Sequence, residues 1–249
     1  MSQQQRMRVL ITGAGGRIGT TLALHLRDRY ALRLHYHHAP PNPPVDDVVT
    51  GDVSDFAAMQ RAVTGVDAVV HLAADPRTTA PWDSVLPNNI IGTYNVFEAA
   101  RQAGVRKIVF ASTNHVMGMY DRDHQWPVYS HLPVRPDSLY GVSKAFGEAL
   151  GRYYADRYGI SVICLRIGWF LSEPHDEISR WMWLSPRDCV QIVWRALESP
   201  LPFGIFYAIS NNSGRHWDIT DAMELLGYRP EDDAERFFTD TAEPAPDAS

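Results

Sequence analysis

The stretch that decides the fold of this chain is Arg8-Val-Leu-Ile-Thr-Gly13-Ala-Gly-Gly16-Arg-Ile-Gly19. Residues 9–12 are apolar or β-branched and predict a buried strand. Glycines follow at every third position, and an amphipathic helical pattern begins at Ile18. A strand, a glycine-rich turn and a helix in direct succession are the setting in which such glycines bind the pyrophosphate of a dinucleotide.

Each glycine of this turn has a separate physical task. Gly13 permits the tight turn, Gly16 lets the backbone approach the pyrophosphate, and Gly19 allows the helix to pack closely on the sheet. The alternative is a glycine-rich turn that binds no ligand. The segment supplies the first predicted cofactor contacts, which are Gly13, Gly15, Gly16, Arg17, Ile18 and Gly19.

Short apolar runs alternate with helical stretches over residues 1–166, which is the pattern of repeated βαβ units on a parallel sheet. Strands are predicted at residues 8–12, 31–35, 48–51, 68–72, 107–111 and 161–166. Helices are predicted at residues 18–28, 55–63, 90–103 and 140–157. The predicted fold class is therefore α/β, a Rossmann-type doubly wound parallel sheet with a small C-terminal substrate-binding lobe.

The regular alternation weakens after residue 166, where Trp, Pro and Ser appear among short segments. This part predicts a helix at residues 186–198, a strand at 204–210 and a helix at 220–226. We expect a single domain over residues 1–249. Residues 1–166 would mainly form the dinucleotide-binding core, residues 167–240 mainly a substrate-covering lobe, and residues 241–249 a frayed tail.

The composition is that of a soluble globular protein, with 45% hydrophobic and 21% charged residues. The net charge is −6 and no segment gathers Lys and Arg, which argues against a nucleic-acid or membrane partner. The N-terminal segment resembles neither a signal peptide nor a membrane span, so we expect a cytoplasmic location. Cys164 and Cys189 lack metal-binding or redox spacing, so we expect no metal site and two buried thiols.

The end of the second predicted strand lacks an acidic residue. Its sequence is Leu34-His35-Tyr36-His37-His38, where an NAD-selective site usually offers a carboxylate to the ribose hydroxyls. Imidazoles tolerate a 2′-phosphate and attract it when charged, so NAD and NADP both stay open as the cofactor. Asp52 lies at the end of the third predicted strand, before Val53. Its carboxylate could accept a hydrogen bond from the adenine amine or cap the next helix.

Tyr140 and Lys144 lie four residues apart at the start of a predicted helix, which places both side chains on one face. An ammonium beside a phenol favours the phenolate, so we expect Lys144 to lower the pKa of Tyr140 toward that of a general base. The lysine could also hold a ribose. Such a pair also occurs by chance on exposed helices. The hydroxyls of Ser112-Thr113-Asn114-His115 follow a strand at the carboxyl edge of the sheet, where ligands bind.

Together these residues resemble the extended short-chain dehydrogenase/reductase family, in its NAD-dependent epimerase/dehydratase group. The resemblance covers nearly the whole chain and implies a homodimer. It is carried by Gly13-x-x-Gly16-x-x-Gly19, His71-Leu72-Ala73-Ala74, Ser112-Thr113-Asn114-His115, Tyr140-Gly-Val-Ser-Lys144 and Leu165-Arg166-Ile167-Gly168. It implies further cofactor contacts at Tyr36, His37, Asp52, Val53, Leu72, Ala73, Ala74, Asn89, Tyr140, Lys144 and Ile167.

The resemblance also implies catalytic roles. Tyr140 would be the base, Lys144 its activator and ribose anchor, and Thr113 the orienting hydroxyl, with Ser112 as the alternative. The chain is most similar to uronate dehydrogenases and to haloarchaeal NAD-dependent glucose-6-phosphate dehydrogenases, which oxidise a cyclic sugar at its anomeric carbon to a lactone. Both share Asn88-Asn89-Ile90-x-Gly92-Thr93 with this chain, and the phosphate-sugar enzyme adds Asp75-Pro76-Arg77.

The same resemblance implies substrate contacts at Asp75, Arg77, Asn114, His115, Trp169 and Arg180. Arg77 and Arg180 could bind an anion at the far end of a sugar, because a guanidinium pairs with such groups through two hydrogen bonds. Each could instead form a surface ion pair. Asn114 and His115 could face the sugar ring or cap a turn. Trp169, which replaces a Ser of the uronate enzymes, could stack on the ring or pack in the core.

The expected function is an NAD(P)-dependent dehydrogenase that oxidises the C1 hydroxyl of a hexopyranose to its lactone. The sugar would carry a phosphate, carboxylate or sulfonate at position 6. One alternative is an epimerase or dehydratase that retains NAD and acts on a nucleotide-linked sugar, although the short C-terminal lobe offers little wall for a nucleotide tail. An alternative of another class is a non-catalytic dinucleotide-sensing regulator.

Overall fold

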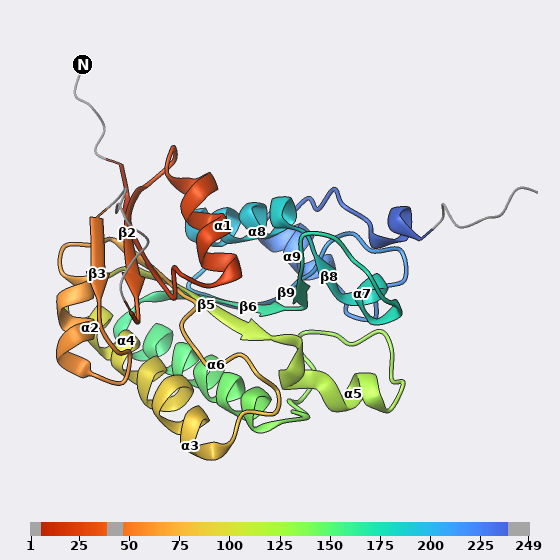
Figure 1. The fold of residues 1–249 in the computed structure, drawn as a ribbon, viewed down its shortest axis with the longest axis horizontal. Helices are drawn as coiled ribbons and strands as arrows, with labels where there is room; N and C mark the ends of the chain where they lie inside the picture. The colour runs from red at the N-terminus through yellow and green to blue at the C-terminus, as the bar shows by residue number, and fades with distance from the viewer. Residues whose placement is uncertain (1–5, 39–46, 239–249) are drawn as a thin grey trace, which may run out of the picture.

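The computed structural model describes residues 6–38 and 47–238, and Figure 1 shows their arrangement around a central parallel sheet. The sheet of the described residues has seven strands in the order β3-β2-β1-β4-β5-β6-β9. In chain order they are β1 (Arg8–Thr12), β2 (Ala31–Tyr36), β3 (Asp47–Thr50), β4 (Ala68–His71), β5 (Lys107–Thr113), β6 (Ser161–Ile167) and β9 (Phe203–Ala208). All neighbouring pairs are parallel. The predicted Rossmann-type sheet is confirmed.

Helices cover both faces of the sheet (Figure 1). On one face lie α1 (Arg17–Leu26) and α8 (Pro186–Glu198), whose buried side chains share a cluster with β1 and β6. On the other face lie α2 (Phe56–Val63), α4 (Gly92–Gln102) and α6 (Leu139–Tyr158), which pack against a second cluster. The central strands between them are therefore buried on both faces and mainly apolar, rather than alternating between apolar and polar residues.

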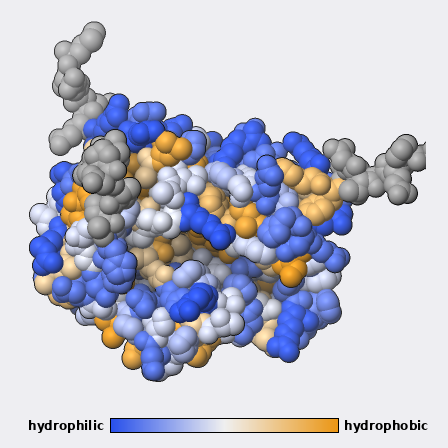
Figure 2. Space-filling model, in the orientation of Figure 1, coloured by the Kyte–Doolittle hydropathy of each residue, from blue (hydrophilic) through white to orange (hydrophobic). Residues whose placement is uncertain are grey.

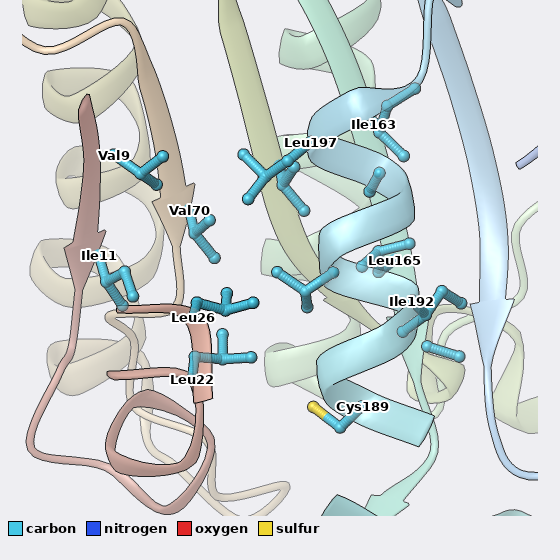
Figure 3. Packing of buried hydrophobic residues seen from close by; sticks show 14 of the residues in the cluster. Val9, Ile11, Leu22, Leu26, Val70, Ile163, Leu165, Cys189, Ile192 and Leu197 are labelled. Carbon is cyan, nitrogen blue, oxygen red and sulfur yellow. The ribbon is translucent and has the colours of Figure 1, made fainter. Parts of the chain in front are cut away.

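Successive residues of each strand supply opposite faces of this core. Val9 and Ile11 of β1 belong to the cluster under α1 and α8, whereas Leu10 belongs to the other cluster. Figure 3 shows Leu22 of α1 and Ile192 of α8 among the side chains that fill the first face. This two-sided burial fixes the register of the strands and so aligns their carboxyl ends at one edge.

Residues after 166 divide between two places. The helix α8 and the strand β9 complete the Rossmann layers. The rest forms a second, two-stranded sheet and short helices. These are β7 (Trp169–Phe170), α7 (Glu177–Met182), β8 (Trp183–Leu184), α9 (Thr220–Leu225) and η3 (Ala234–Phe237). The tail predicted over residues 241–249 lies outside the described residues.

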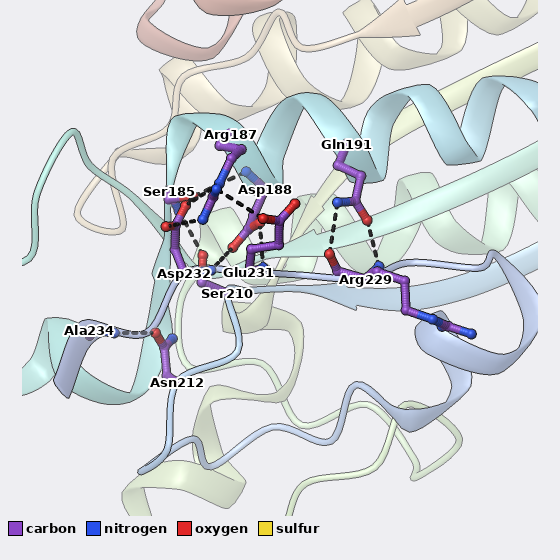
Figure 4. A network of polar contacts seen from close by, with 10 residues as sticks. All are labelled: Ser185, Arg187, Asp188, Gln191, Ser210, Asn212, Arg229, Glu231, Asp232 and Ala234. Carbon is purple, nitrogen blue, oxygen red and sulfur yellow. Dashed lines mark hydrogen bonds and ion pairs between the residues drawn. The ribbon is translucent and has the colours of Figure 1, made fainter. Parts of the chain in front are cut away.

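A buried polar network fixes the last described segment to the start of α8 (Figure 4). The carboxylate of Asp188 is fully buried and accepts the backbone N–H groups of Glu231 and Asp232 at 2.9 and 3.1 Å. Burial raises the pKa of Asp188. Arg187 adds ion pairs to Asp232 at 2.6 Å and to Glu231 at 3.0 Å. These bonds hold the chain that leads to η3 against the Rossmann core.

Several element boundaries differ from the prediction for physical reasons. The strand β5 runs on through Thr113, because Ser112 and Thr113 pair with the extended end of β6. The helix predicted at residues 90–103 begins earlier, since α3 (Trp82–Val85) and a π-helical segment η1 (Leu86–Ile91) lead directly into α4. Pro87, the second residue of η1, hid this start from the sequence, because proline is disfavoured inside a helix.

Other short helices carry no strong sequence signal. They are η2 (Asn114–Met117) and α5 (Gly118–Arg122), which follow β5 without a break. None of the helices in residues 6–38 and 47–238 is long and apolar enough to cross a membrane.

Gly147 lets α6 lie directly on β5. A Cβ at this position would overlap the ring of Phe110, which is fully buried. We expect Gly147→Ala to lower the free energy of unfolding by about 1–3 kcal/mol, because overpacking a tight core forces its neighbours apart. Gly214→Ala is the matched control, since a Cβ there meets nothing within 4 Å, and should change stability by less than about 0.5 kcal/mol. Urea unfolding measures both, and equal midpoints would refute the tight contact.

Candidate active site

A cavity of about 1130 Å³ opens at the carboxyl edge of the sheet. Its walls come from the glycine turn before α1, the ends of β4, β5 and β6, the first turns of α6, and α7. Figure 2 shows a hollow in the face below α1. Ligands of open α/β sheets bind at this edge, so the cavity is the candidate active site.

The glycine turn is shaped for close approach by a ligand. Gly13 has φ +69°, and a Cβ on it would lie 2.9 Å from the backbone nitrogen of Ala73. A Cβ on Gly19 would overlap the carbonyl oxygen of Gly13. The helix α1 begins directly after Gly16, and its first turn carries no acidic side chain. Its N-terminal amides and positive dipole end therefore suit a phosphate, and the turn fits the pyrophosphate of a dinucleotide.

A hydrogen-bonded network that sequence reasoning missed fixes this turn to β4. The hydroxyl of Thr12 accepts the backbone N–H groups of Leu72 and Ala73 at 3.1 and 3.2 Å. It lies 2.8 Å from Nδ1 of His71 and, having accepted twice, donates its proton there. Burial lowers the pKa of His71 well below its usual range. The neutral ring then presents its Nε2–H to the hydroxyl of Thr93 at 3.3 Å.

Four predicted cofactor contacts lie at or just after the ends of β2 and β3 and do not line the cavity. They are Tyr36, His37, Asp52 and Val53. The Tyr36 ring is 3.3 Å from where a Cβ of Gly15 would stand. The Asp52 carboxylate accepts the backbone N–H and the hydroxyl of Ser54, both at 2.8 Å, and lies 3.4 Å from Nε2 of His37. Val53 is buried. Asp52 does not cap α2, because Asp55 occupies that position.

Asn89, a predicted cofactor contact, is engaged by neighbouring residues of the chain. Its buried amide accepts from the backbone N–H of Asp75 at 2.8 Å and donates to the carbonyl of Asp75 and the hydroxyl of Ser143. These bonds use its acceptor once and both of its N–H groups. Asn89 therefore positions the loop after β4 against α6. Asp75 also faces this loop and holds the guanidinium of Arg77 at 2.6 Å.

The predicted catalytic side chains meet at the junction of β5 and α6. Ser138 caps α6, its hydroxyl accepting from the backbone N–H of Gly141 at 3.1 Å. Tyr140 and Lys144 both line the cavity, and the Thr113 hydroxyl hydrogen-bonds to Tyr140. The hydroxyl of Ser112 turns away and donates to the carboxylate of Glu148 at 2.6 Å. Of the two hydroxyls considered, that of Thr113 is the one beside the phenol.

The prediction that Lys144 lowers the pKa of Tyr140 is wrong for this structure. Burial raises the pKa of Tyr140 to about 12, although the bond from Thr113 acts in the opposite direction. Burial also lowers the pKa of Lys144 to about 7. The Lys144 Nζ donates to the carbonyl of Ala111 at 2.7 Å and lies 5.7 Å from the centre of the Tyr140 ring. Burial away from water therefore has a larger effect on both pKa values than the attraction between the ammonium and the phenolate that the four-residue spacing suggested.

A buried ion pair beneath these residues was also missed from sequence. Glu148 and Arg166 are 4% and 1% exposed and form two hydrogen bonds of 2.8 Å. The pair joins α6 to β6 and receives the hydroxyl of Ser112, so it holds β5 beside α6. The available signals were an acidic residue four positions after Lys144 on the same helix and an Arg within an apolar strand.

The predicted substrate contacts lie in different places. Asn114, His115, Arg77 and Trp169 line the cavity. Asp137 bonds to Nδ1 of His115 at 2.8 Å, which leaves Nε2 for a ligand.

Arg180 is a correction to the predicted substrate contacts. It does not line the cavity, and its guanidinium pairs with the carboxylate of Glu235, with Nε 3.1 Å away. Of the two arginines proposed for an anion, only Arg77 reaches the cavity.

The cavity wall is cationic. Arg17 and Arg77 contribute to it, and no Asp or Glu of the described residues lines it, although Asp75 pairs with Arg77 from outside the wall. A wall with charges of one sign raises the local concentration of ligands of the other sign. The cavity therefore favours anionic ligands, even though the chain as a whole has a net charge of −6.

Comparison with known proteins gives consistent results. The model of the NAD dependent epimerase/dehydratase family matches residues 9–182. The chain is 42% identical to a NAD-dependent glucose-6-phosphate dehydrogenase of Haloferax volcanii, over 96% of this chain and 98% of the relative. It is 43% identical to an L-arabinose 1-dehydrogenase (NAD(P)(+)) of the same organism, over 91% and 97%. A uronate dehydrogenase structure from Agrobacterium tumefaciens superimposes with a TM-score of 0.86 at 35% identity, over 97% and 91%.

Removing the buried carboxylate of Glu148 should be costly. We expect Glu148→Gln to lower the free energy of unfolding by about 3 kcal/mol or more, because Arg166 would stay buried without a counter-charge. Asp156→Asn is the matched control on the same helix, since the Arg152–Asp156 pair is 60% and 59% exposed, and should cost about 0.5 kcal/mol or less. Denaturant unfolding of both variants measures the difference. Equal losses would show that the buried pair does not brace the site.

Proposed function

This chain belongs to the NAD dependent epimerase/dehydratase family, and we propose that it oxidises the C1 hydroxyl of a hexopyranose with a 6-position anion to the lactone. It is an NAD(P)-dependent oxidoreductase that acts on the CH–OH group of sugars, as its relatives do. To this activity the proposal adds three points: oxidation takes place at C1, the sugar carries an anion at position 6, and Tyr140 is the base.

One observation carries the proposal. The phenol of Tyr140, the hydroxyl of Thr113 and the guanidinium of Arg77 line the same cavity, and no Asp or Glu of the described residues lines it. A small molecule that carries both a reactive hydroxyl and an anionic group could place the hydroxyl at Tyr140 and the anion at Arg77. Two of the relatives act on glucose 6-phosphate and on uronate, sugars with an anionic group at carbon 6.

Arg77 is suited to the anion because its guanidinium is already oriented. Asp75 binds it through Nε at 3.0 Å and Nη2 at 2.6 Å. A guanidinium has five N–H groups, so those not used by Asp75 are left for a carboxylate, phosphate or sulfonate. The Asp75 side chain is only 8% exposed and also binds the hydroxyl of Ser84, which keeps the pair in place.

The chemical roles follow from the positions of the side chains. The phenolate of Tyr140 takes the proton of the C1 hydroxyl, and Thr113 donates to the oxygen as its C=O bond forms. Bound NAD(P) supplies the acceptor for the C1 hydride, which no side chain provides. Lys144 and the amides at the start of α1 would hold its ribose and its phosphates. His115, oriented by Asp137, would bind a ring hydroxyl through Nε2.

Two other functions remain to be distinguished by experiment. An epimerase or dehydratase that retains its NAD would release no reduced cofactor from a free sugar. A dinucleotide sensor would bind the cofactor without turnover. A UDP-galactose 4-epimerase superimposes at 24% identity, which is a likeness of fold alone.

The substrate test is the appearance of reduced cofactor with each of six sugars. Glucuronate, galacturonate, glucose 6-phosphate and sulfoquinovose carry the anion, and glucose and arabinose do not. We expect one anionic hexose to exceed the neutral sugars at least about tenfold in kcat/KM. Arg77→Met should remove about 1.5–3 kcal/mol of that preference, the usual value of a hydrogen bond to a charged group, while leaving the neutral sugars unchanged.

Arg180→Met is the control for this test, because it removes the other arginine that was considered. Preference for a neutral sugar, or an effect of Arg180→Met in place of Arg77→Met, would contradict the proposed anion site. No reduced cofactor with any sugar would favour the epimerase or the sensor.

The pH dependence tests the base. The pKa of Tyr140 is raised to about 12, so the phenolate fraction grows as pH rises toward that value. We expect kcat/KM to increase from pH 7 to pH 10, by at most about tenfold per pH unit for one deprotonation. Tyr140→Phe should abolish turnover at every pH and preserve dinucleotide binding measured by calorimetry. A falling profile, or turnover by Tyr140→Phe, would exclude Tyr140 as the base.

A further inference from the structure

The glycine turn and the end of β2 are in direct contact. The backbone N–H of Ala14 donates to the carbonyl of His35 at 3.0 Å. The Tyr36 ring lies 3.3 Å from where a Cβ of Gly15 would stand, so no side chain separates the turn from the strand end. A ribose bound beside the turn therefore meets Tyr36 and the residues that follow it.

Among the described residues, this strand end offers no uncommitted carboxylate to a ribose. NAD sites usually place an acidic residue here, which accepts from the ribose hydroxyls and repels a 2′-phosphate. Tyr36, His37 and His38 occupy this place, with the two imidazole rings 4.1 Å apart. The carboxylate on the neighbouring strand end is Asp52. One of its oxygens takes both bonds from Ser54, and the other lies 3.4 Å from His37.

Arg17 supplies an available cation on the other side of the turn. It is the first residue of α1, it is exposed, and it lines the cavity. Across residues 6–38 and 47–238, no hydrogen bond or ion pair engages its guanidinium. Arg77, also in the cavity wall, is instead held by Asp75. A guanidinium without a partner can bind a phosphate through two parallel hydrogen bonds.

We propose that this strand end is a 2′-phosphate site, so that the chain binds NADP at least as tightly as NAD. Arg17 is the main ligand of the phosphate, and His37 adds an imidazole N–H on the strand side. The proposal rests on the dinucleotide cofactor of the proposed function and is independent of the sugar.

The test uses calorimetric titration of the full chain with 2′,5′-ADP and with 5′-AMP, which differ by the 2′-phosphate alone. We expect 2′,5′-ADP to bind at least about tenfold more tightly, the effect of one charge-assisted phosphate contact. Arg17→Gln should abolish this difference, and the loss of affinity should be larger for 2′,5′-ADP than for 5′-AMP. Arg27→Gln is the matched control, because it removes an exposed arginine from the end of the same helix, outside the cavity.

Equal affinities for the two nucleotides in the parent chain would overturn the proposal. So would a preference for 2′,5′-ADP that persists in Arg17→Gln. Titration with NAD shows in each variant whether the rest of the dinucleotide site is intact. If NAD binds and sugars are oxidised while the 2′-phosphate contributes nothing, this inference fails and the proposed function stands.

Discussion

The structure depends on the contact between the backbone of Gly13 and the backbone of Ala73, which leaves no room for a side chain. This approach brings the end of β1 against the end of β4, and the Thr12–His71 network holds the two together. The turn that results starts α1 with its amides directed at the cavity. The dinucleotide site is thus a consequence of backbone packing, and the side chains around it decide what else can bind.

Burial affects the pKa values of Tyr140 and Lys144 more than the attraction between the two side chains does. Tyr140 and Lys144 are both withdrawn from water, and the same cause raises the pKa of the phenol and lowers that of the amine. Both groups are therefore closer to neutrality than their spacing suggests, and stabilisation of a phenolate must come from close dipoles such as the Thr113 hydroxyl. The Glu148–Arg166 pair has its charges balanced within the core, so it can brace β5 without adding net charge to the site.

The elements that could be predicted from sequence are those fixed by local pattern. The bounds of β1 and α8 follow directly from their residues, and the Tyr140–Lys144 spacing placed both side chains on one helix face. What could not be predicted depends on residues distant in the chain. Arg180 pairs with Glu235, 55 positions later, and Asn89 is taken up by Asp75 and Ser143. The pKa of Tyr140 follows from how much protein covers it, which no spacing records.

The two arginines of the cavity differ in a way that bears on specificity. Arg77 is held by Asp75, so in the proposed function it would bind an anion without first losing conformational freedom and would discriminate by position. Arg17 has no such partner in the described residues, so the proposed phosphate would have to order it, and it would discriminate less sharply. A fixed guanidinium suits a small substrate that must be aligned with Tyr140. A mobile one suits a cofactor that is already anchored by its pyrophosphate, and it allows the same turn to accept a dinucleotide with or without a further phosphate.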